Sequence, residues 1–424
     1  MSDLPTHVNE RTPLVNGNGS PSREPFTHRV MHVLKAEGQP SWLASYRYFL
    51  FGSWLNILLV FVPLSAVAHY SNWDAAYRFA FSFIAIMPLA ALLGTATEQM
   101  SLELGDTLSG LLNASFGNAV EIIVGIAALM QGELRIVQTS LLGSILSNLL
   151  LVLGCSFFAG GCVQSESTFQ ATAAQAASSL MTLACITLVI PAAYHSASVH
   201  SGIDTPELLN KTLQIIDGSD LDDRAEYGLK VISRGTAILL LLVYIGYLYF
   251  QLGSHSHLFK PMDESRTEVE TPLMNVPAAG VSLLAVTVVT SFCADYLVAS
   301  IEETAERYSI PKAFIGLILL PIVANAAEHV TSVWMAMKNK MELTIGICVG
   351  SSIQIAAFVV PLLVIVGWIT HHDLTLFFAD FETIVLFVSV LLVNFLIQDG
   401  KSNYMEGIML ITLYCVVALA FWVS

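Results

Sequence analysis

Gly117-Asn118-Ala119-Val120-Glu121 and Ala324-Asn325-Ala326-Ala327-Glu328 are two short polar motifs, each set inside a long apolar run. In both motifs the asparagine precedes the glutamate by three residues, so on a helix the two side chains share one face. The two motifs are separated by a constant offset of 207 residues (325 − 118 and 328 − 121). One such match arises easily by chance, so the flanking sequence must show whether the two motifs belong to an internal repeat.

The same offset continues through the next apolar run. Gly143-Ser144 matches Gly350-Ser351, and Ser147 matches Gln354. Two successive helices whose polar residues match at the same offset, without a gap, indicate an internal repeat. We therefore expect two related halves of the chain, each with an acidic helix followed by a second helix that carries polar side chains.

The composition is that of a membrane protein. Of the 424 residues, 55% are hydrophobic and only 12% are charged, whereas soluble domains average about 25% charged residues. The mean hydropathy is +0.68. A net charge of −15 offers no positive surface to nucleic acid. The six cysteines form no CxxC pair, which favours buried small side chains over disulfide or metal chemistry.

Eleven apolar segments are long enough to span a bilayer. They cover approximately residues 48–69, 75–95, 107–131, 135–160, 172–195, 229–252, 278–300, 311–337, 342–368, 374–397 and 404–423. Polar loops at His200–Lys230 and Gln251–Asn275 interrupt the series. The sequence thus predicts an all-α polytopic membrane protein. Its parts are a tail (1–47), an accessory helix (48–69), a first five-helix repeat (75–252), an acidic linker (253–277) and a second five-helix repeat (278–424).

The number of spans decides how the two repeats are oriented. Five steps, an odd number, separate the third span from the eighth, so the matched helices cross the membrane in opposite directions. Such an inverted repeat places a transport site near the bilayer midplane. Lysine and arginine residues near the spans are evenly divided between the two sides, so the positive-inside rule does not orient the chain.

Glu121 and Glu328 are the most informative residues of the chain. A charged side chain near the bilayer centre costs roughly 2.5–3.5 kcal/mol on insertion scales. No lysine or arginine lies near the middle of any predicted span, so the partners left are protons or a bound cation. The alternative is a pair of protonated structural glutamates bonded to helix backbones.

An oxygen-rich set of side chains surrounds the two glutamates. An all-oxygen shell suits calcium and, less exclusively, manganese or sodium, and two carboxylates match the charge of a divalent ion. Gly117, Gly143, Gly350 and Pro321 are expected to allow close helix approach or helix breaks near this site. The proposed neutral ligands are Asn118, Asn325, Ser144, Ser147, Ser351 and Gln354.

Other polar residues fall into three groups. His329 stands where the first repeat has Ile122, and either a role in proton or cation binding or a packed core position fits it. Asp295, Glu98 and Glu302 are candidates for an access path, although a solvated helix end also fits Glu302. The acidic residues of the linker lack EF-hand spacing, so a regulatory calcium site and a solvated linker both stay open. These linker residues are Asp263, Glu264, Glu268 and Glu270.

Several motifs together resemble a known family, the calcium/proton exchangers of the cation-antiporter superfamily, and within it the vacuolar exchangers of fungal type. The motifs are GNAVEIIVGIAAL from Gly117, GSILSNLLLVLG at Gly143–Gly154, ATEQ at Ala96–Gln99, NAAEH at Asn325–His329 and GSSIQIAAF at Gly350–Phe358. The resemblance extends from about the first span to the end of the chain.

The resemblance implies a fold of eleven helices with a cytosolic N-terminus and an essential acidic pair at Glu121 and Glu328. It also implies that a cytosolic calcium-binding acidic helix corresponds to the Asp263–Glu270 region, with Glu98 beside it. The implied activity is antiport of calcium against protons in the membrane of an acidic organelle such as the vacuole, without a cofactor; the sequence leaves open whether manganese is carried as well.

Other function classes share some of these features. A sodium-driven calcium exchanger of the same superfamily and a cation channel remain the alternatives. An intramembrane hydrolase needs a motif such as HExxH or a nucleophile triad, and the sequence has neither, so we do not expect an enzyme. The only partners expected are calcium, protons and the lipid bilayer, and the sequence leaves open whether the chain forms a homo-oligomer.

Overall fold

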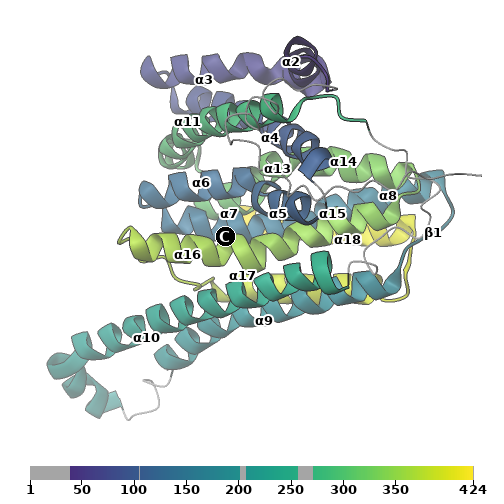
Figure 1. Ribbon diagram of the computed structural model, residues 1–424. Coiled ribbons are helices and arrows are strands. Elements are labelled where there is room, and N and C mark those ends of the chain that lie inside the picture. The colour runs from purple at the N-terminus through teal and green to yellow at the C-terminus, as the bar shows by residue number, and fades with distance from the viewer. Residues whose placement is uncertain (1–38, 105, 201–206, 256–270, 424) are drawn as a thin grey trace, which may run out of the picture.

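The computed structural model describes residues 39–104, 106–200, 207–255 and 271–423, which are almost entirely helical (Figure 1). The first half comprises α2 (Trp42–Phe51), η1 (Trp54–Val60), α3 (Phe61–Tyr70), α4 (Ala75–Leu104), α5 (Asp106–Phe116), α6 (Ala119–Met130), α7 (Leu134–Leu146), η2 (Ser147–Val152), α8 (Leu153–Val163), β1 (Ser167–Thr168), α9 (Ala171–His200), α10 (Glu207–Tyr249) and η3 (Phe250–Ser254). The second half comprises α11 (Val276–Tyr308), α12 (Lys312–Phe314), η6 (Ile315–Leu319), α13 (Leu320–Ala324), α14 (Ala326–Met337), α15 (Met341–Gln354), η7 (Ile355–Val359), α16 (Val360–Ile369), α17 (Asp380–Leu396), β2 (Lys401–Ser402) and α18 (Tyr404–Val423).

The helical membrane fold predicted from the apolar segments is confirmed. Among the described residues, seven helices are long and apolar enough to cross a membrane, or nine if each of two bent helix pairs is one span. The remaining two predicted spans coincide with α5–α6 and α17, but α6 has 12 residues and α17 has 17. Both are shorter than a full crossing of about 20 residues, so the count of eleven stays a prediction.

Helix ends differ from the apolar segments at three places. Helix α2 begins at Trp42, inside the predicted tail, α4 continues to Leu104, and α10 begins at Glu207 within the predicted loop 200–230. Hydropathy marks only the part of a helix that lies in the bilayer. A helix continues into water where residues such as glutamate, leucine and lysine favour it, and apolar patterning does not detect that continuation.

The central helices of the two halves are interleaved. In Figure 1, α9 and α10 lie side by side along one edge, α2 and α3 lie at the opposite edge, and α6, α7, α14 and α15 lie between them. Helix α4 packs along α11, and α8 packs against both α14 and α18. A two-residue antiparallel ladder, Ser167 opposite Ser402, joins β1 and β2. The first half therefore contacts the second along most of its length.

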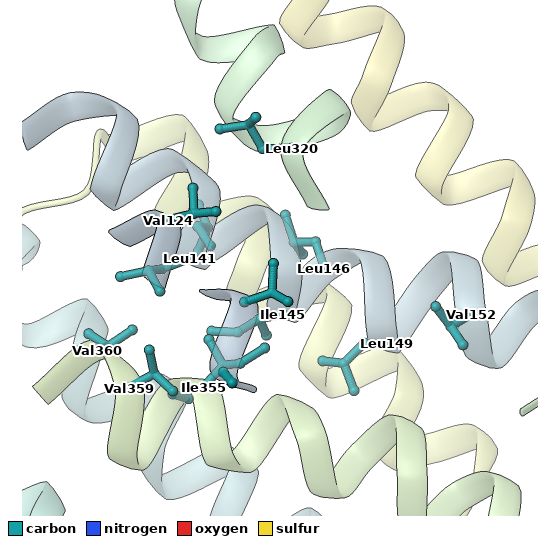
Figure 2. Packing of buried hydrophobic residues seen from close by; sticks show 14 of the residues in the cluster. Val124, Leu141, Ile145, Leu146, Leu149, Val152, Leu320, Ile355, Val359 and Val360 are labelled. Atoms are coloured by element: carbon teal, nitrogen blue, oxygen red, sulfur yellow. The ribbon is translucent and has the colours of Figure 1, made fainter. Parts of the chain in front are cut away.

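The core between the halves is formed by apolar side chains from α6, α7, η2, η7 and α16 (Figure 2). Ile145 and Leu149 of the first half point toward Ile355 and Val359 of the second. Where α7 crosses η6, the backbones themselves touch, because a Cβ atom added to Gly143 would lie 2.2 Å from the carbonyl oxygen of Leu317. Small residues permit such close crossings, which are a main source of helix association in membranes.

The internal repeat is visible in the helix ends. Helices α6 and α14 begin at Ala119 and Ala326, which are separated by the same offset as the two motifs, and their last residues keep that offset. The π-helical turns η2 and η7, which follow α7 and α15, end at Val152 and Val359 and so keep it as well. The inverted orientation of the two halves relative to the membrane stays a prediction.

A buried ion pair also connects the halves. Glu382, at the start of α17, is 1% exposed and makes a bidentate pair with Arg135 of α7, in which Nη1 donates to Oε2 at 3.1 Å. The backbone N–H of Ala379 donates to the same carboxylate at 3.2 Å. Removing one partner of a buried pair leaves an uncompensated charge. Replacing one residue of this pair therefore lowers stability more than replacing both.

We expect Arg135→Met to lower the free energy of unfolding by about 2 kcal/mol. This is below the range of about 3–5 kcal/mol for fully buried pairs, because the Arg135 side chain is 42% exposed. The double variant Arg135→Met/Glu382→Gln should recover part of the loss, since no buried charge remains. Thermal melting in detergent measures both, and equal melting temperatures for the parent and Arg135→Met would contradict this role.

Candidate cation site

The two glutamates lie in the first turns of helices that begin inside the bundle. Helix α6 starts after Asn118, and α14 starts after Asn325, where the chain bends by 57° between α13 and α14. The predicted break near Pro321 is therefore confirmed, with the bend four residues beyond the proline. Because the first turn of a helix carries unpaired N–H groups and the positive end of the helix dipole, these positions favour negative charge.

Neither asparagine caps its own helix, and both reach across to the other half instead. The Asn118 amide Nδ2 donates to Gln354 Oε1 at 2.6 Å, and Ser351 Oγ donates to Asn118 Oδ1 at 2.8 Å. Asn148 Nδ2 donates to Ser351 Oγ at 3.0 Å. These bonds form a continuous chain of polar side chains between α6, η2 and α15, which we call the polar network.

The second asparagine makes the reciprocal contact. Asn325 Nδ2 donates to the backbone carbonyl oxygen of Ser144 on α7 at 3.3 Å. Each half of the chain thus holds the asparagine of the other half. Side-chain hydrogen bonds between the two repeats therefore help to fix the interior of the bundle.

The two carboxylates lie beside this network. Glu121 is 7% exposed, and Glu328 is half-buried. The Glu328 carboxylate interacts with the side chains of Ser351 and Asn148 and electrostatically with Glu121. The two acidic groups are therefore close enough to interact electrostatically.

Three buried oxygens around the glutamates have no hydrogen-bond partner within the described residues. They are Oε2 of Glu328, Oδ1 of Asn325 and Oδ1 of Asn148. Buried polar atoms are paired in the great majority of cases, so unpaired oxygens in one place point to a ligand or water. Carboxylate and amide oxygens are the ligands that a hard cation prefers.

Two cavities lie beside the glutamates, and each is lined by a different one. The larger, with an empty volume of about 2,370 Å³, is lined by Glu328, Ser351, Gln354 and Glu98 among others, and we call it the vestibule. The smaller, about 370 Å³, is lined by Glu121 and Ser144 and otherwise mainly by apolar side chains such as Leu297. Ser351 and Gln354 of the polar network line the vestibule, whereas the smaller cavity reaches the site through Glu121 and Ser144.

The structure brings most of the predicted ligands together. Ser147 is the exception, because its buried hydroxyl lies against Tyr414 of α18 instead. Asn148, which the alignment of the two repeats did not single out, belongs to the polar network in place of Ser147. Its counterpart in the second repeat is the apolar Ile355, so the repeat gave no signal, although its position four residues after Ser144 places both on one helix face.

The residues predicted for access or proton coupling are dispersed. Glu98 lines the vestibule, whereas Asp295 is exposed, and its carbonyl oxygen accepts from Gln131 Nε2 at the far end of α6. Glu302 is exposed and pairs with Lys312 Nζ at 2.7 Å, as a solvated helix end does. His329 is half-buried and lines neither cavity.

The acidic residues predicted for a regulatory calcium site lie outside the described residues. They are Asp263, Glu264, Glu268 and Glu270.

Comparison with known proteins identifies the family. A family model described as sodium/calcium exchanger protein matches residues 75–253 and 279–423. The chain belongs to this exchanger family. Its membership confirms the prediction that the protein is a transporter and not an enzyme.

Individual members of the exchanger family are similar along most of their length. The vacuolar calcium ion transporter of Schizosaccharomyces pombe is 46% identical over 88% of this chain and 85% of its own length. Vacuolar cation/proton exchanger 2 of Oryza sativa subsp. japonica is 40% identical over 98% of this chain and 95% of its own. These relatives confirm the resemblance to vacuolar exchangers that the motifs indicated.

Solved structures agree with this assignment. Native YfkE superposes with a TM-score of 0.70 at 34% identity and covers 87% of this exchanger and 100% of its own chain. A selenium-substituted form of the same protein is described as a Ca²⁺/H⁺ antiporter. The H⁺/Ca²⁺ exchanger CAX superposes with a TM-score of 0.60 at 12% identity, which supports the fold alone.

The neighbours Ser147 and Asn148 give a matched test of the site in this exchanger. We expect Asn148→Ala to raise the calcium concentration for half-maximal transport about tenfold, since one good polar contact is worth about 1.5 kcal/mol. Ser147→Ala should change it less than twofold, because Ser147 lies against Tyr414. Transport assays over a range of calcium concentrations measure both, and the opposite ranking would contradict the geometry.

Proposed function

We propose that this exchanger carries calcium from the cytosol into the vacuole, or another acidic compartment, in exchange for protons. The observation that carries the proposal is the pair of glutamates, of which Glu328 lines the vestibule and Glu121 the smaller cavity, together with the polar network that joins the two repeats beside them. The names of the relatives support calcium and protons as the two exchanged ions, because these relatives are calcium transporters and cation/proton exchangers. Calcium, protons and, as a second cation, manganese are then transported ions, and no resident cofactor is involved.

The donor set matches calcium chemically. Within the described residues, no three histidine, cysteine, aspartate or glutamate side chains gather to hold a metal ion. In the proposed site, Glu121 and Glu328 supply two carboxylates, and neutral oxygens of asparagine, serine and glutamine complete the shell. Two negative charges balance one divalent cation, and amide and hydroxyl oxygens fill the further positions that calcium requires.

Exchange follows from competition for the same two carboxylates. Either one divalent cation or protons neutralise them, so binding of one kind releases the other. Because the two groups interact, their protonation belongs to the pair rather than to Glu121 or Glu328 alone. Transport further requires that the site open to one side at a time, which the two related halves achieve by moving relative to each other around it.

The proposed orientation places the vestibule on the cytosolic side. With a cytosolic N-terminus, the end of α4 that carries Glu98 and the linker before α11 both lie in the cytosol. Calcium would then enter through the vestibule and reach Glu328 first, whereas Glu121 faces the smaller cavity toward the lumen. In this arrangement the described structure is open to the cytosol.

Reconstitution into proteoliposomes tests the proposal. An imposed pH gradient should drive calcium uptake, and uptake should collapse when a protonophore dissipates the gradient. A sodium gradient of the same size should drive none, which separates proton coupling from sodium-driven exchange. Calcium flux that persists without any counter-ion gradient would instead indicate a channel.

A further inference from the structure

Three segments that are far apart in the sequence meet at one buried junction beside the vestibule. They are the residues before α2, the last residues of the linker, and the end of α4. Asn275 is fully buried there, where it donates to the carbonyl oxygen of Pro40 at 3.0 Å and receives a hydrogen bond from Ala278 N at 2.8 Å, which caps α11. Its own N–H donates to Ser45 Oγ at 3.1 Å.

Gln99 connects this junction to α4. It is 5% exposed, and its single oxygen Oε1 accepts from the backbone N–H groups of Leu273 at 2.7 Å and Met274 at 3.1 Å. Within the described residues, no other acceptor contacts these two N–H groups. Because buried N–H groups are almost always paired, the hydrogen bonding of α4 to Leu273 and Met274 depends on this one glutamine oxygen.

Two adjacent residues of α4 face different surroundings. Glu98 is exposed and lines the vestibule, while Gln99, about 100° further around the helix, points into the junction. The end of α4 also follows Pro88. A proline within a helix removes a backbone hydrogen bond, so the contacts that Gln99 makes add to the packing of α4 along α11 in holding the segment after Pro88.

We propose that Gln99 is a positioning residue, which anchors the end of α4 to the linker junction and thereby holds Glu98 on the vestibule wall for cation entry. This gives the last residue of the ATEQ motif a physical role distinct from that of the glutamate before it. The effect on calcium entry rests on the proposed function, whereas the anchoring does not.

Transport kinetics test the first part. Gln99→Met keeps the length of the side chain and removes the acceptor, and it should raise the KM for calcium at least threefold with the maximal rate within twofold of the parent. Gln99→Glu keeps an acceptor for both N–H groups and should retain the parental KM. Gln138→Met is the matched control, because Gln138 ties a different loop through Thr375 O and should leave the KM unchanged.

Accessibility tests the anchoring without any transport. In a chain whose native cysteines are replaced, Glu98→Cys is labelled with a hydrophilic maleimide, with and without Gln99→Met. We expect the labelling rate to change at least threefold with Gln99→Met and to stay constant with Gln138→Met. If Gln99→Met yields no folded protein, Gln99→Asn, which is shorter by one methylene, replaces it.

The outcomes separate the two proposals. An unchanged labelling rate, an unchanged KM, or the same shifts from Gln138→Met would overturn the role of Gln99. A parent chain that moves no calcium against a pH gradient would overturn the proposed function, and the labelling rates would still decide the anchoring.

Discussion

Glutamine at position 121 or 328 is expected to abolish proton-coupled calcium transport, with rates at least a hundredfold below the parent. Glu121→Gln and Glu328→Gln keep the size and hydrogen-bonding capacity of the side chain but remove the charge. Stripping calcium of its water is costly unless nearby anions compensate, and each half of the chain supplies one anion. A single remaining carboxylate cannot balance the divalent ion or carry the same protons.

Both variants should remain folded, because a neutral amide is less costly in a bilayer than a carboxylate. Monodispersity in detergent checks this. Glu302→Gln is the matched control, since it removes a carboxylate from an exposed ion pair with Lys312 and should keep the parental rate. Aspartate at either position keeps the charge, shortens the reach by one methylene, and should give an intermediate rate. Parental transport by Glu121→Gln or Glu328→Gln would show that the cation binds elsewhere.

The second large effect is on stability and concerns two glycines that the repeat makes equivalent. In Gly143→Ala the new methyl group would lie 2.2 Å from the backbone oxygen of Leu317, whereas nothing lies within 4 Å of the corresponding position at Gly350. A backbone carbonyl cannot turn aside as a flexible side chain does, so α7 and η6 must separate. We expect Gly143→Ala to cost about 3 kcal/mol, at the upper end of overpacking changes.

Gly350→Ala should have little effect on stability or increase it slightly, because alanine favours a helix over glycine by roughly 1 kcal/mol. Thermal melting of the two purified variants in detergent provides the comparison. Similar melting temperatures would mean that the crossing of α7 and η6 is looser than its geometry indicates.

This pair of glycines also shows what the sequence predicts and what it does not. The constant offset between the two motifs predicted that Gly143 and Gly350 are equivalent, and it correctly placed both acidic helices. It carries no information about the neighbouring element, which is η6 for one glycine and the open vestibule for the other. Packing between segments distant in the chain therefore has to come from the structure.

Ser147 and Asn148 illustrate a second limit. The offset favoured Ser147 because it pairs with the polar Gln354, yet Asn148 faces the site. Both residues begin the π-helical turn η2, and extra residues per turn rotate side chains away from the α-helical register. Apolar patterning and residue spacing predicted the helices that carry the two glutamates, while the local change of helical register at η2 decided which neighbouring polar side chain enters the polar network.

The hydrogen bond between Asn118 and Gln354 has a consequence for biosynthesis, because it joins residues 236 positions apart. At roughly 5–20 residues per second, a ribosome needs on the order of 10–50 s to make that length of chain. During this interval α6 has been synthesised while Ser351 and Gln354 do not yet exist. The insertion machinery, and not the finished fold, must therefore accommodate the nascent acidic helix until the second half arrives.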